Sequence, residues 1–211
     1  MPGEHPQHRR RLRLADDGGA RGGDEARCHG LRLHLDGARL WNAAVATGIP
    51  EHEWAAPFDT ISVCFSKGLG APVGSALAGP RDFIARARRF KALFGGGIRQ
   101  GGIVAAGALF ALENNRSRLS EDHANASRLA QRLASLPGIL LDPATVQTNI
   151  VRFRLRDIPA GSFVDRCHAS GVHMLPTGAS GVCTVTHLDV SAAEIEHVAE
   201  VIERTLKRQA A

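Results

Sequence analysis

The sequence predicts an α/β protein in which a partial parallel-sheet domain precedes a smaller α/β carboxyl-terminal domain. Two strand-like runs, residues 31–36 with a leucine at every second position and the apolar run 60–66, flank a helical stretch in the first part. A strand–helix–strand order of this kind joins parallel strands by a right-handed crossover. In the last third, shorter strand-like and helix-like segments alternate. The 211 residues are enough for one or two domains with a hydrophobic core.

Apolar patterning, glycine and proline define the elements of the first domain. Residues 31–36 are predicted to form a short strand, and residues 39–47 a helix that ends at Gly48, a residue type that readily closes a helix. The dense apolar run 60–66 favours a strand that is buried on both faces. The further predicted elements are a short strand over 74–78, a helix over 81–93 and an apolar helix over 103–113.

In the last third, apolar patterning, proline and glycine again define the elements, which follow one another at shorter intervals. An amphipathic helix over 119–135 ends at Pro137-Gly138, because neither residue favours continuation of a helix. Ser191 and Glu194 have the spacing of a capping box, which predicts that a terminal helix begins there. Between these helices the predicted elements are strands over 138–141, 149–155 and 182–187 and a helix over 162–170.

The amino-terminal stretch differs from the rest of the chain. Residues 1–30 contain no valine, isoleucine or phenylalanine and show no apolar period, so they cannot bury enough surface to offset their ordering entropy. A disordered tail is therefore predicted over 1–30. Two domains are predicted to follow, a larger α/β domain over 31–115 and a small α/β domain over 116–211.

Charge and apolar runs exclude two classes of partner. The net charge is +5, but the basic residues are spread out, and the densest run, 81–91, alternates with apolar residues as in an amphipathic helix. The longest apolar run, 103–112, is too short to span a bilayer, and the amino terminus has no apolar signal segment. Neither nucleic acid nor a membrane is expected as a partner.

Histidine and cysteine spacing excludes a metal site and paired disulfides. The histidines are too dispersed for metal ligation, so no metal is expected. The four cysteines are Cys28, Cys64, Cys167 and Cys183. They show no paired spacing, which favours reduced thiols and a cytoplasmic location.

Asp36 and Lys67 stand at the carboxyl ends of the two predicted parallel strands. Such ends meet at one edge of a sheet, where open α/β folds bind ligands. Pyridoxal phosphate requires a lysine amine that forms a Schiff base and a carboxylate that holds the pyridine nitrogen protonated. The alternative is structural: Asp36 caps the helix that starts near Ala38, and Lys67 is a solvated turn residue.

Three segments resemble the L-threonine aldolase family. They are His-Leu-Asp-Gly-Ala-Arg at 34–39, Ser-Lys-Gly-Leu-Gly-Ala-Pro-Val-Gly-Ser at 66–75 and Gly-Gly-Gly-Ile-Arg-Gln at 95–100. The family consists of pyridoxal-phosphate-dependent lyases with the aspartate-aminotransferase fold. The resemblance runs from about residue 33 to the end of the chain, with matching order and spacing.

The resemblance implies a role for four residues. Lys67 would be the Schiff-base lysine and Asp36 the partner of the pyridine nitrogen. Arg39 would lie near the cofactor's ring hydroxyl and the substrate carboxylate, and Arg99 would reach the site of a neighbouring subunit. The implied activity is cleavage of L-threonine or L-allo-threonine to glycine and acetaldehyde, carried out by a homo-oligomer, either a dimer or a dimer of dimers.

The chain also departs from the family. The family's amino-terminal half, which carries the phosphate-binding turn and a histidine stacked on the ring, has no counterpart here. The arginine that binds the substrate carboxylate falls at Cys183, and a lysine of the family aligns with Ala92. We therefore expect a truncated chain with weak or no activity. The alternatives are a non-catalytic remnant or isoform that keeps the family's oligomer surface, and another β-eliminating lyase of the same fold.

Overall fold

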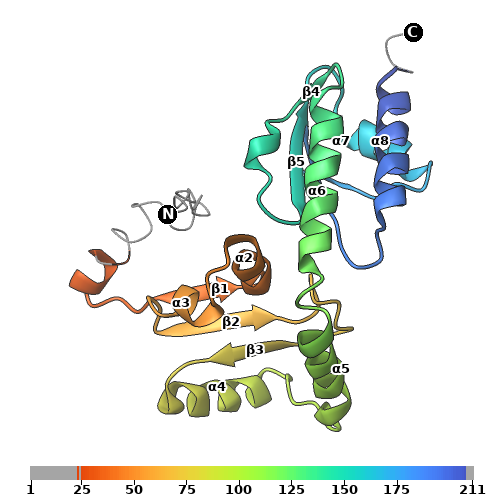
Figure 1. Ribbon diagram of the computed structural model, residues 1–211. Coiled ribbons are helices and arrows are strands. Elements are labelled where there is room, and N and C mark those ends of the chain that lie inside the picture. Colours follow the sequence, from red (N-terminus) through yellow and green to blue (C-terminus); the bar gives the residue numbers. More distant parts are fainter. Residues whose placement is uncertain (1–22, 24, 208–211) are drawn as a thin grey trace, which may run out of the picture. The chain divides into compact units, whose positions relative to one another are not determined.

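The computed structural model describes residue 23 and residues 25–207, and the chain divides into two compact units (Figure 1). The first unit comprises the residues up to Lys67 together with Ala71–Glu113. The second comprises Gly68–Gly70 together with the residues from Asn114 onward.

Most of the predicted tail, 1–30, lies outside the described residues. Its last part differs from the expectation, because residues 25–28 are helical. The Arg27 guanidinium donates a hydrogen bond to the Pro57 carbonyl, with the two atoms 2.5 Å apart. This contact ties residues 25–28 to the first unit.

The first unit is built on a three-stranded sheet of order β1-β2-β3. β1 (His34–Gly37) and β2 (Thr60–Cys64) are parallel, whereas β3 (Ser75–Ala78) runs antiparallel to β2. The sheet is mixed rather than purely parallel, because the short segment between β2 and β3 is a turn and not the long crossover that a parallel neighbour needs.

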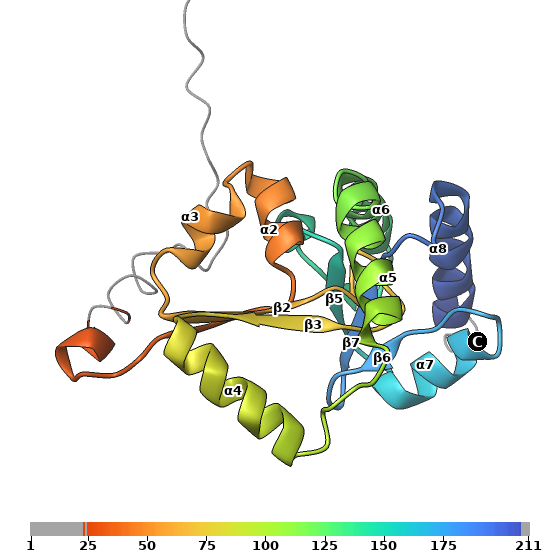
Figure 2. The same ribbon diagram turned by 90° about the horizontal axis from the view of Figure 1, so that it is seen from below.

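Besides helical residues 25–28, the described part of the first unit contains the helices α2 to α5. α2 (Leu40–Thr47) and α3 (Glu51–Ala55) lie on one face and α4 (Arg81–Leu93) on the other, as Figure 2 shows. α2 ends as predicted at Gly48, which has a left-handed φ of 70°. α5 (Gly101–Asn114) follows a glycine-rich loop. The short helix α3 is absent from the sequence-based prediction.

Few side chains of the first unit are buried. Leu40, Trp41 and Ala44 of α2 are buried, and the rings of Trp41 and Phe65 lie 5.3 Å apart. The expectation that β2 is buried on both faces is wrong, because all five of its residues are only half-buried. Every residue of β3 is exposed, and α4 contributes no buried residue. The described side chains that pack on this small sheet are too few to shield it from solvent.

The second unit contains a four-stranded antiparallel sheet of order β4-β5-β7-β6. Its strands are β4 (Ile139–Leu140), β5 (Ile150–Leu155), β6 (Leu175–Pro176) and β7 (Gly181–Val185). A single 3₁₀ turn, η2 (Pro143–Thr145), lies between β4 and β5. β6 and this turn are too short to give a periodic signal, and the sequence did not predict them.

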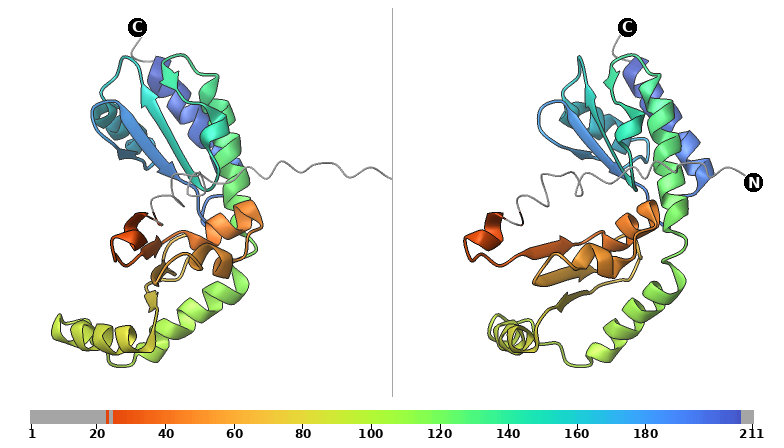
Figure 3. Two further views of the ribbon diagram at one scale, coloured as in Figure 1. Left: turned by 90° about the vertical axis from the view of Figure 1, so that its left-hand side faces the viewer. Right: turned by 60° about the vertical axis from the view of Figure 1, so that its left-hand side comes forward.

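The helices of the second unit are α6 (Leu119–Ala134), α7 (Ala160–His168) and α8 (Ala192–Lys207). In Figure 3, α6 (green) and α8 (dark blue) run beside the sheet, and the two helices contact each other. Alternate residues of β5 are buried against the helices, whereas Arg152 and Arg154 are exposed on the opposite face. This alternation confirms the predicted strand pattern.

The predicted capping box forms at the start of α8. The Ser191 hydroxyl and the Ser191 backbone N–H each bond the Glu194 carboxylate at 2.7 Å. None of the four cysteines is paired in a disulfide. Among the described residues, no helix is both long and apolar enough to cross a lipid bilayer.

Candidate functional site

The structure places Asp36 and Lys67 at the same end of two neighbouring strands. β1 and β2 are parallel, with Asp36 paired to Ser62 and Gly37 to Val63. β1 ends at Gly37 and β2 at Cys64, and Lys67 follows in the turn after β2. The two side chains therefore belong to one carboxyl edge, which is where open α/β sheets bind ligands.

Asp36 begins the turn from β1 to α2. Its Oδ1 atom accepts a hydrogen bond from the Ala38 N–H at 3.1 Å. This contact corresponds to the structural alternative, in which the aspartate only closes the turn. A carboxylate has two oxygens and about four lone-pair sites, so one local bond leaves it able to accept others. Asp36 is exposed, and its carboxylate is accessible to a ligand.

The same face of the sheet carries further polar side chains. Paired residues of neighbouring strands and alternate residues of one strand point to the same side. His34, Asp36, Thr60 and Ser62 therefore share a face. The His34 ring bonds the hydroxyls of Thr60 and Ser62 at 2.8 and 3.3 Å.

This polar face was missed from the sequence. Its signal was a period of two, with polar residues at 34 and 36 and again at 60, 62 and 64. The high apolar content of the intervening positions in the second strand hid that period.

Lys67 is exposed in a loop whose base is held within the first unit. The Ala71 N–H donates to the Phe65 carbonyl at 3.0 Å, and the Phe65 N–H donates to the Gly74 carbonyl at 3.0 Å. Gly68 and Leu69, which follow the lysine, are buried. The loop thus has a fixed backbone and presents the lysine amine to solvent.

Arg39 and Arg99 are placed differently. Arg39 directly precedes α2 and follows the Asp36 turn, with a half-buried side chain and a carbonyl that accepts the Ala43 N–H at 3.0 Å. Arg99 is exposed in the loop between α4 and α5. The structure therefore places Arg39 beside the strand ends and Arg99 on a separate loop.

Cys183 lies in β7 of the second unit, where it pairs with Arg152 of β5. Its side chain is half-buried on the face that also carries Arg152. The position that the family resemblance assigns to a carboxylate-binding arginine thus holds a thiol with a guanidinium directly opposite.

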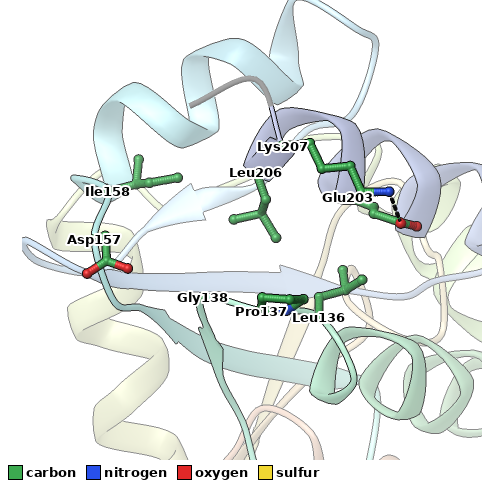
Figure 4. A pocket seen from close by; sticks show the side chains of 8 residues that line it. All are labelled: Leu136, Pro137, Gly138, Asp157, Ile158, Glu203, Leu206 and Lys207. Atoms are coloured by element: carbon green, nitrogen blue, oxygen red, sulfur yellow. Dashed lines mark hydrogen bonds and ion pairs between the residues drawn. The ribbon is translucent and has the colours of Figure 1, made fainter. Parts of the chain in front are cut away.

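A cavity of about 410 Å³ lies in the second unit, near the end of α8 (Figure 4). Leu136, Ile158 and Leu206 line it with apolar carbon, and Glu203 and Lys207 form an ion pair of 2.6 Å at its rim. None of the four candidate residues contributes to this cavity. The described residues hold no cluster of histidine, cysteine, aspartate and glutamate that could bind a metal ion.

Solved structures define the class of protein to which this arrangement belongs. A Listeria monocytogenes protein superposes with a TM-score of 0.70 at 26% identity, over 88% of this chain and 54% of that one. The threonine aldolase of Leishmania major gives a TM-score of 0.66 at 20% identity, over 86% of this chain and 54% of its own. At such low identity the second match shows the fold alone. These two matches show that the chain has an α/β fold of the kind that these proteins share.

The sequence then identifies the family. A model of the beta-eliminating lyase family matches residues 23–156, and the chain belongs to this family. It is 43% identical to the low-specificity L-threonine aldolase of Escherichia coli K12 over 169 residues, 80% of this chain and 49% of the relative. It is 35% identical to low-specificity L-threonine aldolase 1 of Arabidopsis thaliana over 187 residues, 87% of this chain and 52% of the relative. The chain spans about half the length of these curated relatives.

Proposed function

We propose that the chain acts in a pyridoxal-phosphate-dependent lyase that cleaves the Cα–Cβ bond of L-threonine or L-allo-threonine, giving glycine and acetaldehyde. Homology to the aldolases of E. coli and A. thaliana supports the reaction class. The observation that carries the proposal is the placement of Asp36 and Lys67 after neighbouring parallel strands. Residues 31–115 would form the cofactor-binding domain and residues 116–211 the smaller domain.

The residues at the sheet edge fit the cofactor. Its aldehyde requires an accessible lysine amine, and Lys67 is exposed. Its pyridine nitrogen requires a carboxylate, and Asp36 uses one oxygen in its turn and keeps lone pairs for a ring N–H. When bound, the cofactor supplies an electron sink for the electron pair that is released as the Cα–Cβ bond breaks.

The chain's own residues have separate tasks in this proposal. Asp36, as an ionised carboxylate, favours the protonated ring nitrogen through a charge-assisted hydrogen bond. Arg39 supplies a guanidinium after the same turn, and its planar fork suits a carboxylate or a ring oxygen. Arg99 would serve the site of a second copy, since its own loop is not at the strand ends.

We expect this chain by itself to have very weak or no aldolase activity. The sheet that carries the two residues is thinly covered, and a misplacement of about 1 Å can cost about a hundredfold in rate. Cys183 cannot supply a guanidinium, and the loss of such a contact costs about 1.5–3 kcal/mol, or roughly ten- to a hundredfold. Acetaldehyde release measured with saturating cofactor should fall well below about one turnover per second.

Covalent labelling tests the cofactor site directly. The chain is incubated with pyridoxal phosphate, reduced with borohydride and mapped by peptide mass spectrometry. Lys67 should carry the label, and Lys67→Ala should abolish it. Lys91 of α4 and Lys207 of α8 are exposed internal controls, because neither stands at a strand end beside an acid. A label on the controls with none on Lys67 would disprove the assignment.

A second candidate is another β-eliminating lyase of the same fold. The family model favours it, because that family is named for β-elimination. Acetaldehyde and pyruvate release, measured side by side with threonine and with serine as substrates, separates the two reactions. A chain that takes no label on Lys67 and releases neither product would instead be a non-catalytic form that retains the family's surface.

We further propose a cytoplasmic homo-oligomer, a dimer or a dimer of dimers. The first unit exposes large apolar side chains on α4 and α5, which a second copy would cover. The four unpaired cysteines are compatible with a reducing compartment. Sedimentation velocity of the purified chain measures the oligomeric state.

A further inference from the structure

Lys67 lies at a boundary between the two compact units. The chain up to Lys67 and the chain from Ala71 to Glu113 belong to the first unit. The three residues between them, Gly68–Gly70, belong to the second unit. The lysine is therefore joined by one peptide bond to a segment that packs with a different part of the molecule.

Leu69 is the residue of this segment that a hydrogen bond joins to the rest of the second unit. Its side chain is 1% exposed, so it is packed as tightly as a core leucine. Its carbonyl accepts a hydrogen bond from the Asn115 side-chain amide at 2.8 Å. Asn115 lies at the start of the second unit, directly after α5 and four residues before α6. Burial and a hydrogen bond thus hold the same residue.

Gly70 shows how closely the segment is fitted. Its φ is +72°, a conformation that residues with a Cβ rarely adopt. A Cβ built on Gly70 would overlap the Cδ2 atom of Leu188, which belongs to the loop between β7 and α8. The backbone angle therefore favours glycine at this position, whereas the flexible end of the Leu188 side chain could move away from a Cβ.

We infer that Asn115 is a positioning residue for Lys67 and acts through the segment Gly68–Gly70, which directly follows the lysine. The inference rests on the proposed function of Lys67. On one side, Phe65 and Ala71 close the loop in the first unit through their 3.0 Å hydrogen bond. On the other side, the Cα atom of Gly68 lies about 3.8 Å from that of Lys67, as consecutive residues must. Loosening of Gly68–Gly70 should therefore increase the mobility of the adjacent lysine.

Trypsin cleavage measures the positioning without cofactor, because the bond Lys67–Gly68 is itself a trypsin site. Asn115→Ala removes one amide–carbonyl hydrogen bond, which should raise the open population of the loop, and the cleavage rate, roughly fivefold. Thr205→Val is the control, because the buried Thr205 hydroxyl donates to the Val201 carbonyl at 2.8 Å within α8 of the same unit. The control should leave cleavage after Lys67 unchanged, and Asn115→Gln, which keeps an amide donor, should recover part of the protection.

The outcomes separate this inference from the proposed function. Equal cleavage after Lys67 in Asn115→Ala and Thr205→Val would overturn the positioning role, whatever the labelling result. Faster cleavage in Asn115→Ala alone, together with partial recovery in Asn115→Gln, would support it. Faster cleavage in a chain whose Lys67 takes no pyridoxal label would support the positioning and would overturn the proposed function instead.

Discussion

The two units differ in how much of their apolar surface they bury. The second unit surrounds one cluster of buried side chains, all between Ala126 and Ile202, and Phe163 at its centre is fully enclosed. In the first unit, α4 has no buried residue and β3 is exposed along its whole length. The unit that carries the candidate cofactor residues thus depends on further contacts, whereas the second unit is packed by its own residues.

The exposed apolar side chains of the first unit indicate where those contacts would form. Leu93 and Phe94, at the end of α4, are 70% and 79% exposed. The rings of Phe90 and Phe94 stack 6.2 Å apart, so they present a continuous apolar surface. Ile98 of the following loop and Ile103 of α5 are also exposed. Contiguous exposed apolar surface of this kind marks an interaction site.

The largest expected effect is the loss of a core aromatic ring in the second unit. Phe163→Ala should destabilise that unit by about 3–5 kcal/mol, because the ring is buried and packs edge-on against Phe153. Urea unfolding followed by circular dichroism reports on both units. Tryptophan fluorescence reports on the first unit alone, because Trp41 and Trp54 both lie there.

The matched control removes an exposed ring of the same type. Phe90→Ala should change the free energy of unfolding by no more than about 0.5 kcal/mol, because Phe90 is more than half exposed. If the two variants lost the same free energy of unfolding, the buried ring would stabilise the protein no more than the exposed one, and the difference in packing between the units would not affect stability.

A smaller effect is expected on self-association. Changing Leu93 and Phe94 to serine should weaken the association of the chain at least about tenfold, because large apolar side chains carry most of the energy of an interface. Sedimentation velocity over a range of concentrations measures it. Leu140→Ser in the second unit is the control, because this leucine is also exposed but lies outside the α4 surface. Equal weakening by the control would place the interface elsewhere.

Much of the fold could be predicted from local signals. The helix over 81–93 has the bounds of α4, and the helix over 39–47 ends at Gly48 as expected. These features depend on residues within one or two turns of each other, which the sequence displays directly. α3, β6 and the direction of β3 were not predicted, because a few residues carry no period and strand direction depends on the partner.

The candidate site could be predicted only where it follows from strand order. Asp36 and Lys67 were placed at one edge by the crossover rule, and the parallel pairing of β1 with β2 confirms that arrangement of strands. The contact between Asn115 and Leu69 joins residues 46 positions apart in the sequence. No local pattern contains such a contact, because it depends on how the second unit packs around the segment.

A third prediction concerns the start of α8 in the second unit. Ser191→Ala should cost the second unit about 1 kcal/mol, the usual contribution of a helix N-cap. Thermal unfolding followed by circular dichroism measures the loss. Ser120→Ala is a suitable control, because the Ser120 hydroxyl bonds only a carbonyl near the start of α6. A loss as large in the control would show that the capping box has no special contribution.

The same capping box gives a pH dependence with a defined sign. Hydrogen bonds from Ser191 hold the pKa of Glu194 below its ordinary value of 4.5. A carboxylate with a lowered pKa stabilises the folded state above its unfolded pKa, and this contribution disappears as the pH falls through the lowered value. The stability difference between the wild type and Glu194→Gln should therefore shrink below about pH 4.5. A difference that grew on acidification would contradict the assignment.

The smallest expected effect is at Cys183, the position to which the family resemblance assigns an arginine. Arg152 of β5 lies directly opposite Cys183 of β7, on the exposed face of the sheet. Cβ atoms of such pairs lie about 4.5–5.5 Å apart, and like charges placed there repel. Cys183→Arg should therefore lower the stability of the second unit by about 0.2–1 kcal/mol.

The repair should also fail to restore activity. A guanidinium at 183 would be repelled by its neighbour, and the sheet that carries Asp36 and Lys67 would remain as thinly covered as before. Adding Arg152→Ser to Cys183→Arg removes the repulsion and should recover the lost stability, while acetaldehyde release stays low in both variants. Recovery of stability without activity would assign the defect to the first unit. Activity near one turnover per second, an ordinary enzyme rate, in either variant would show that the thin packing around Lys67 does not limit the reaction.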